Sequence, residues 1–129
     1  MPRRRGFSGG RRLFEGFVKE AIDSLPEEMK SELENVAVLI EDEPSEDWEE
    51  EMGEGGDLLG LYQGVSKKDR GFWYGNVLPD TIIIYQGPLE RMSTSREELR
   101  ENVRQTVVHE VGHYFGLDEE QLRNLEEGD

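Results

Sequence analysis

The segment that most constrains this chain is His109-Glu110-Val111-Gly112-His113, an H-E-x-x-H pattern near its C-terminal end. Residues four apart lie on one face of an α-helix, so both imidazoles can reach a single metal ion. Zinc accepts histidine nitrogens, and three protein ligands leave a fourth position open for water. The ion lowers the pKa of that water to about 7. Glu110, between the histidines, is placed to accept its proton.

The residues around the motif predict the helix that this geometry requires. Ser95 followed by Glu98 is a capping-box pattern, with Thr94 and Glu97 as the alternative one residue earlier. Gly116 is a natural helix end, because glycine readily adopts a left-handed conformation there. Apolar residues recur at four-residue spacing: Leu99, Val103, Val107, Val111 and Phe115. The two histidines fall on roughly the opposite side, so we expect them to face a cleft.

Composition narrows the classes of ligand and partner. The chain of 129 residues suits one domain, contains no cysteine, and has its only two histidines in the motif. The remaining zinc ligand should therefore be Asp or Glu. A formal charge of −15 argues against nucleic acid as the main partner. No apolar run approaches the length of about 18 residues that suggests a membrane helix, and we expect a cytoplasmic protein without a secretory signal.

Patterning along the chain divides it into a tail and one domain. Residues 1–12, rich in Arg and Gly, predict a disordered basic tail ahead of a single domain over residues 13–129. A helix should begin at Leu13 and end at Pro26. Residues 42–56 are dominated by acidic side chains, which predicts a mobile acidic loop.

Three apolar segments have the length of strands. Residues 36–40 form a continuous apolar run, typical of a central strand covered on both faces. Residues 58–65 contain glycines, which favours a bulged or edge strand. Residues 81–85 give the strongest strand signal in the chain.

The third zinc ligand has to come from the residues after the motif. In the longer pattern H-E-x-x-H-x-x-G-x-x-H, the glycine lets the chain turn back toward the metal. Here that glycine is Gly116, and Glu119 occupies the last position, so Glu119 is our candidate ligand. Asp118 is the alternative, although Asp118 with Gln121 also predicts a helix N-cap that would occupy its side chain. Glu120 is a further candidate.

These residues resemble the minimal zincin-like metallopeptidases, a family of small bacterial proteins with the pattern H-E-x-x-H-x-x-G-x-x-D. Glu119 stands where that family usually has Asp. The resemblance extends through segments 59–62, 73–74 and 77–85 and covers roughly residues 13–125. It implies a small α/β (α+β) zincin-like fold. A short twisted mixed sheet of about three strands would pack on an N-terminal helix and the H-E-x-x-H helix.

The resemblance also implies a zinc-dependent peptidase with Glu110 as general base. Its substrate would be a peptide or a flexible protein segment. Few residues follow the third ligand, so a protein partner or self-association is expected to complete the cleft. The alternative is a non-catalytic zinc-binding module that acts in protein–protein interaction. Retention of a base favours catalysis, because structural zinc sites are usually closed by four protein ligands. Tyr62, Tyr74, Tyr85 and Tyr114 are candidate oxyanion donors, and the sequence does not choose among them.

Overall fold

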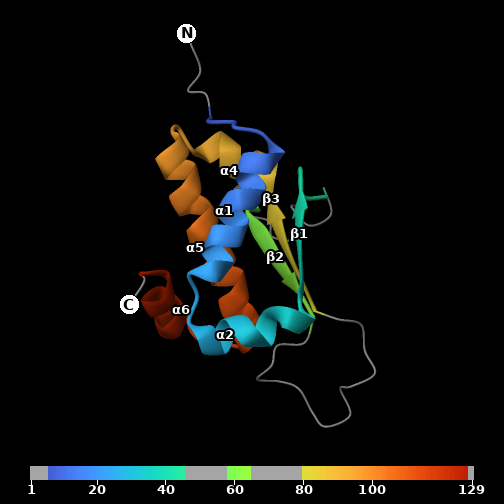
Figure 1. The fold of residues 1–129 in the computed structure, drawn as a ribbon, viewed down its shortest axis with the longest axis vertical. Helices are drawn as coiled ribbons and strands as arrows, with labels where there is room; N and C mark the ends of the chain where they lie inside the picture. The colour runs from blue at the N-terminus through green and yellow to red at the C-terminus, as the bar shows by residue number, and fades with distance from the viewer. Residues whose placement is uncertain (1–5, 46–57, 65–79, 128–129) are drawn as a thin grey trace.

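The computed structural model describes residues 6–45, 58–64 and 80–127 of the chain (Figure 1). Its helices and strands are, in chain order, α1 (Arg11–Asp23), α2 (Glu27–Glu32), the 3-10 turn η1 (Leu33–Asn35), β1 (Ala37–Glu41), β2 (Gly60–Gln63), β3 (Thr81–Tyr85), α4 (Gln86–Met92), α5 (Arg96–Phe115) and α6 (Glu119–Glu126). The protein has a small α+β fold with a three-stranded mixed sheet, as predicted.

The sheet has the order β1-β3-β2. Strand β3 pairs in parallel with β1 and antiparallel with β2, so it takes the central position that its run of three isoleucines favours. Among the strands that the structure describes, β2 lies at an edge, as its glycines predicted.

The prediction that residues 36–40 form the central, doubly covered strand is wrong. Within the described sheet, β1 is an edge strand, and its residues alternate between exposed and half-buried. Val38 and Ile40 pack toward the core, whereas Leu39 is 46% exposed on the other face. A continuous apolar run does not reveal how many faces of a strand will be covered. Here β3, rather than β1, pairs with a strand on each side.

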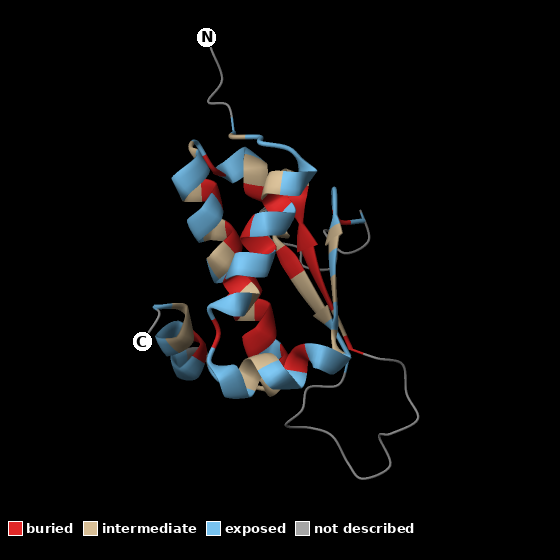
Figure 2. Cartoon of the chain, in the orientation of Figure 1, coloured by how far each residue is buried: buried red, intermediate tan, exposed pale blue. Residues whose placement is uncertain are grey.

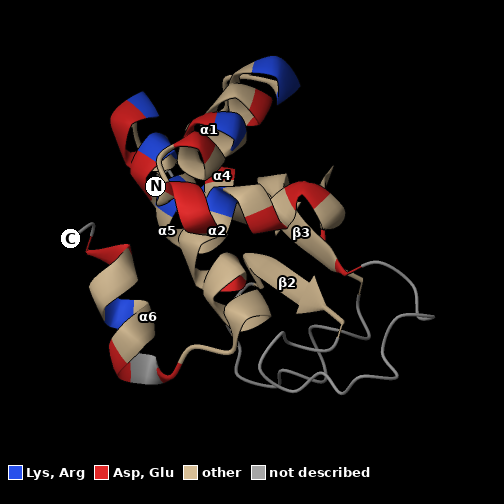
Figure 3. Ribbon diagram, turned by 60° about the horizontal axis from the view of Figure 1, so that its bottom comes forward, with Lys and Arg blue, Asp and Glu red and all other residues tan. Residues whose placement is uncertain are grey.

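The hydrophobic core lies between the sheet and the helices α1 and α5, where the buried residues concentrate (Figure 2). The predicted apolar side of α1 is buried through Phe14, Phe17, Val18 and Ala21. The α5 stripe is also buried, and its last member, Phe115, is half-buried. Strands β2 and β3 carry no charged residue, while the helices contain charged residues of both signs (Figure 3).

The ends of α5 follow the predicted capping chemistry with one change. The Ser95 side chain accepts a hydrogen bond from the Glu98 backbone N–H at 3.1 Å. The Glu98 carboxylate in turn accepts from the backbone N–H of Thr94, one residue earlier than a standard capping box requires. Gly116 ends the helix with φ 73° and ψ 33°, in the left-handed region. The motif is therefore held on a helix fixed at both ends.

The N-terminal segment differs from the tail that we expected. Helix α1 begins at Arg11, and the Phe7 backbone N–H donates to the Ser93 carbonyl at 2.6 Å. Arg11 donates to Gln86 and to Asp42, both at 2.6 Å, so specific polar partners fix residues that composition alone assigned to a disordered tail. Residues 1–5 lie outside the described part of the chain.

The expected acidic loop is only partly described. At its start, Asp42 pairs with Arg11, and Glu43 pairs with Arg91 at 2.7 Å. Residues 46–57 are not described by the structure. Among the residues that are described, no helix has the length and apolar character needed to cross a membrane.

Candidate metal centre

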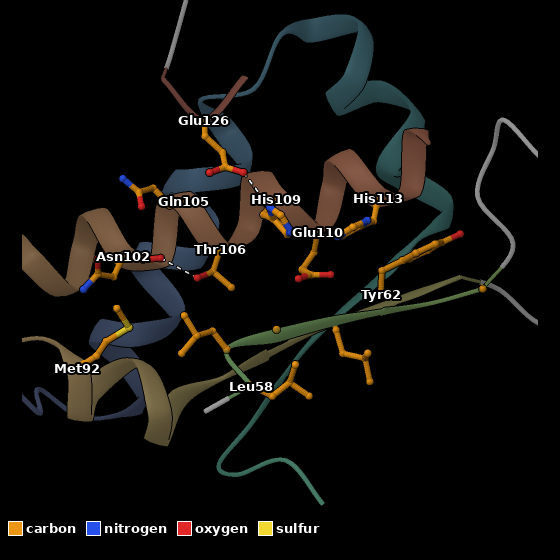
Figure 4. Close-up of a pocket in the computed structure, with 14 residues that line it drawn as sticks. Leu58, Tyr62, Met92, Asn102, Gln105, Thr106, His109, Glu110, His113 and Glu126 are labelled. Atoms are coloured by element: carbon orange, nitrogen blue, oxygen red, sulfur yellow. Dashed lines mark hydrogen bonds and ion pairs between the residues drawn. The ribbon is translucent and has the colours of Figure 1, made fainter. Parts of the chain in front are cut away.

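The two motif histidines converge on one point. Their Nε2 atoms are 3.0 Å apart, and their rings meet edge to face with centroids 4.6 Å apart. Both side chains come from consecutive turns of α5 and line the pocket between this helix and β2 (Figure 4). Histidine nitrogens brought together in this way match the way that two imidazoles share one zinc ion.

Glu110 is the third member of the cluster. One ligating atom from each of His109, Glu110 and His113 lies within 4.8 Å of the others. The Glu110 side chain points from α5 toward β2 and is only 8% exposed (Figure 4). The two imidazole nitrogens suit zinc, and Glu110 lies beside them, where it can reach a water held by the ion.

The surroundings of Glu110 change its acidity. Burial raises the pKa of Glu110 from its ordinary value of 4.5 to about 7. The nearby His109 and a hydrogen bond from the Tyr62 backbone N–H oppose that rise by favouring the ionised form. In the metal-free protein, Glu110 can therefore hold or release a proton near neutral pH.

A pocket of about 700 Å³ opens beside the cluster. Strand β2 and the residues flanking it form one wall, from Leu58 to Gly64, and α5 forms the other, with Thr106, Glu110 and both histidines. Gly60 allows the two walls to approach closely. A Cβ atom there would lie 2.9 Å from the Thr106 methyl and 3.1 Å from Glu110 Cγ.

The candidate third ligands lie at the start of α6. Asp118 caps this helix by accepting from the Gln121 backbone N–H at 2.8 Å, and the Gln121 side chain accepts from the Asp118 N–H. The predicted capping role of Asp118 is thus confirmed. Glu119 is the first residue of α6, but its side chain lies outside the described part of the structure. Glu120 is exposed.

The sequence reasoning missed a further carboxylate, at the end of α6. Glu126 Oε2 lies 2.8 Å from His109 Nδ1, and Glu126 also lines the pocket. The sequence signal that could have revealed Glu126 is its helical spacing from Glu119. Glu119 and Glu126 are seven residues apart, which is close to two turns of a helix.

The four tyrosines that were candidate oxyanion donors lie in different parts of the chain. Tyr62 lines the pocket, while Tyr85 and Tyr114 are buried in the core at 1% and 4% exposure. Tyr74 falls outside the described residues.

Comparison with protein families gives a match over most of the chain. The family described as zincin-like metallopeptidase matches residues 33–129, which include the sheet, the motif helix and α6. Comparison with curated proteins gives no match.

Proposed function

The chain belongs to the zincin-like metallopeptidase family, and on this premise we propose that it hydrolyses peptide bonds with a bound zinc ion. The observation that carries the proposal is the meeting of the two Nε2 atoms, 3.0 Å apart, beside a buried glutamate at the pocket wall. His109, His113 and Glu119 would hold the ion. Glu119 supplies the carboxylate at the spacing from Gly116 that the resemblance implies.

Zinc, when bound, supplies Lewis acidity toward the scissile carbonyl and toward water. Glu110 then acts as general base. Its carboxylate takes a proton from the attacking water and passes it to the leaving amine, and the N–H donated by Tyr62 holds the carboxylate in position. The pKa of about 7 belongs to the metal-free protein, and a zinc ion at the two histidines would favour the ionised carboxylate that a general base needs.

The shape of the pocket favours a peptide as the substrate. Strand β2 pairs with β3 on one side and lies at the edge of the described sheet. An extended peptide can add to such an edge through main-chain hydrogen bonds. Leu58 and Leu59 from the β2 side, with Met92 from α4, provide apolar contacts for its side chains.

Digestion of a peptide library tests the proposal. Zinc-loaded wild type should cleave peptides, and a chelator should stop the reaction. Glu110→Gln should retain zinc and lose about 10²–10⁴ in rate, since that is the usual contribution of a general base. Full zinc occupancy without any cleavage would instead support the non-catalytic binding module.

A further inference from the structure

Helix α6 places a carboxylate behind one of the motif histidines. Glu126 Oε2 lies 2.8 Å from His109 Nδ1, whereas His109 Nε2 faces His113 (Figure 4). Both partners are partly shielded, with side-chain exposures of 39% for His109 and 30% for Glu126. The two ring nitrogens therefore have different neighbours on different sides of the imidazole.

This contact decides where the proton of neutral His109 resides. A neutral imidazole has one N–H donor and one acceptor nitrogen, and an ionised carboxylate can only accept. The proton therefore belongs on Nδ1, toward Glu126. The lone pair then lies on Nε2, which points to the cluster where a metal would be held.

Glu126 is badly placed to be a ligand itself. Its oxygen contacts Nδ1, on the far side of the ring from the point where the two Nε2 atoms meet. Glu126 is absent from the group of ligating atoms within 4.8 Å, which comprises His109, Glu110 and His113 among the described residues. Its position is that of a residue that acts through His109.

Two further contacts hold Glu126 in place. Arg104 on α5 donates to the Glu126 backbone carbonyl at 2.7 Å. One turn earlier in α6, Leu122 is buried against Gly112, where an added Cβ would lie 2.0 Å from the leucine side chain. Both contacts survive replacement of the Glu126 side chain, so variants at this position can test its carboxylate separately from helix docking.

We propose that Glu126 is a positioning residue. It fixes the tautomer and ring orientation of His109 so that Nε2 is available to zinc. The inference rests on the proposed function, because it assigns Glu126 a task in the same zinc site. Outer partners of metal-binding histidines commonly contribute about 10–100-fold to metal affinity.

Nuclear magnetic resonance of the metal-free protein tests the tautomer directly. The chain contains only two histidines, so untagged protein gives just two sets of imidazole ¹⁵N signals. Spectra are recorded at increasing pH until the imidazole signals no longer change, so that the neutral rings are compared. Wild-type His109 should then show a protonated Nδ1. Glu126→Ala should shift His109 toward the other tautomer, whereas Glu126→Gln should largely keep it, since the amide oxygen still accepts.

Zinc affinity provides the second measurement. Glu126→Ala should bind zinc about 10–100-fold more weakly than wild type, with Glu126→Gln between them. Glu127→Gln is the matched control, because it removes the neighbouring exposed charge and should change neither the tautomer nor the affinity. Thermal unfolding of the metal-free variants checks that α6 remains docked.

The outcomes separate the two proposals. If Glu126→Ala keeps the wild-type tautomer or the wild-type zinc affinity, the positioning role is wrong while the peptidase proposal stands. If wild type binds no zinc, the proposed function fails, and the positioning role fails with it.

Discussion

Glutamates of this protein differ in acidity because their surroundings differ. The Arg104 guanidinium beside Glu101 lowers the pKa of that carboxyl, and Arg100 does the same for Glu20. Burial instead raises the pKa of Glu110 to about 7. Burying a carboxylate costs free energy even with the Tyr62 N–H as a partner, and groups buried at such a cost are often found at functional sites.

The raised pKa predicts a pH dependence of stability. Folded Glu110 holds its proton more tightly than the unfolded chain does. Its contribution is therefore fully present below pH 4.5 and is lost as the pH rises through about 7. Since one pKa unit corresponds to about 1.4 kcal/mol, the loss amounts to roughly 3 kcal/mol.

Metal-free Glu110→Gln should accordingly match wild type in unfolding free energy at acidic pH. It should become more stable than wild type, by up to roughly 3 kcal/mol, above neutrality. Chemical denaturation at several pH values, with chelator present, measures the difference. A difference that stays constant across this range would mean that Glu110 is not buried as described.

Gly60 is the residue at which the two walls of the pocket come closest. Gly60→Ala should cost about 1–3 kcal/mol, because its Cβ would press on Thr106 and Glu110. It should also lower peptide hydrolysis by displacing the base. Gly16→Ala is the control: its Cβ would meet nothing within 4 Å on α1, so it should stabilise the protein by about 0.5–1 kcal/mol. Equal effects of the two variants would contradict the close approach.

At the level of the elements, α6 combines a capping residue and a proposed ligand in adjacent positions. Asp118→Ala should remove the N-cap and cost about 1 kcal/mol of stability while zinc binding persists. Glu119→Ala should weaken zinc binding strongly and change the stability of the metal-free protein little. Isothermal titration with zinc and thermal unfolding separate the two effects. If Asp118→Ala loses zinc binding and Glu119→Ala keeps it, the third ligand is Asp118 and not Glu119.

Features of the fold that depend on residues close together in the sequence were predicted correctly. The start of α5 at Ser95, its end at Gly116 and the Asp118 cap all depend on residues close in sequence, and all are found. The covering of β1 and the pairing of Arg11 depend on residues far away in sequence, which no local pattern reveals. The contact between Glu126 and His109 likewise requires knowing that α6 folds back along α5.

For the molecule as a whole, the proposed zinc site and the hydrophobic core share α5. The apolar side of this helix packs in the core with α1 and β3, while its other side presents the histidines to the pocket. The proposed ligand at position 119 and the positioning residue Glu126 are both on α6, which packs against α5 through Leu122. Zinc binding should therefore stabilise the packing of α6 against α5.

Removal of the metal should consequently destabilise the entire fold. A ligand that binds only the folded state stabilises it by about 2.7 kcal/mol when its free concentration is 100 times its dissociation constant. For a domain of this size that corresponds to roughly 10 °C in unfolding temperature. Differential scanning calorimetry with buffered zinc, and again with chelator, should show this shift in wild type and in Glu110→Gln. It should be absent from a His109→Ala, His113→Ala double variant, because that variant lacks both nitrogens that meet at the site. An equal zinc-dependent shift in the double variant would place the metal elsewhere, for instance among the many surface carboxylates, and would remove the basis for the peptidase proposal.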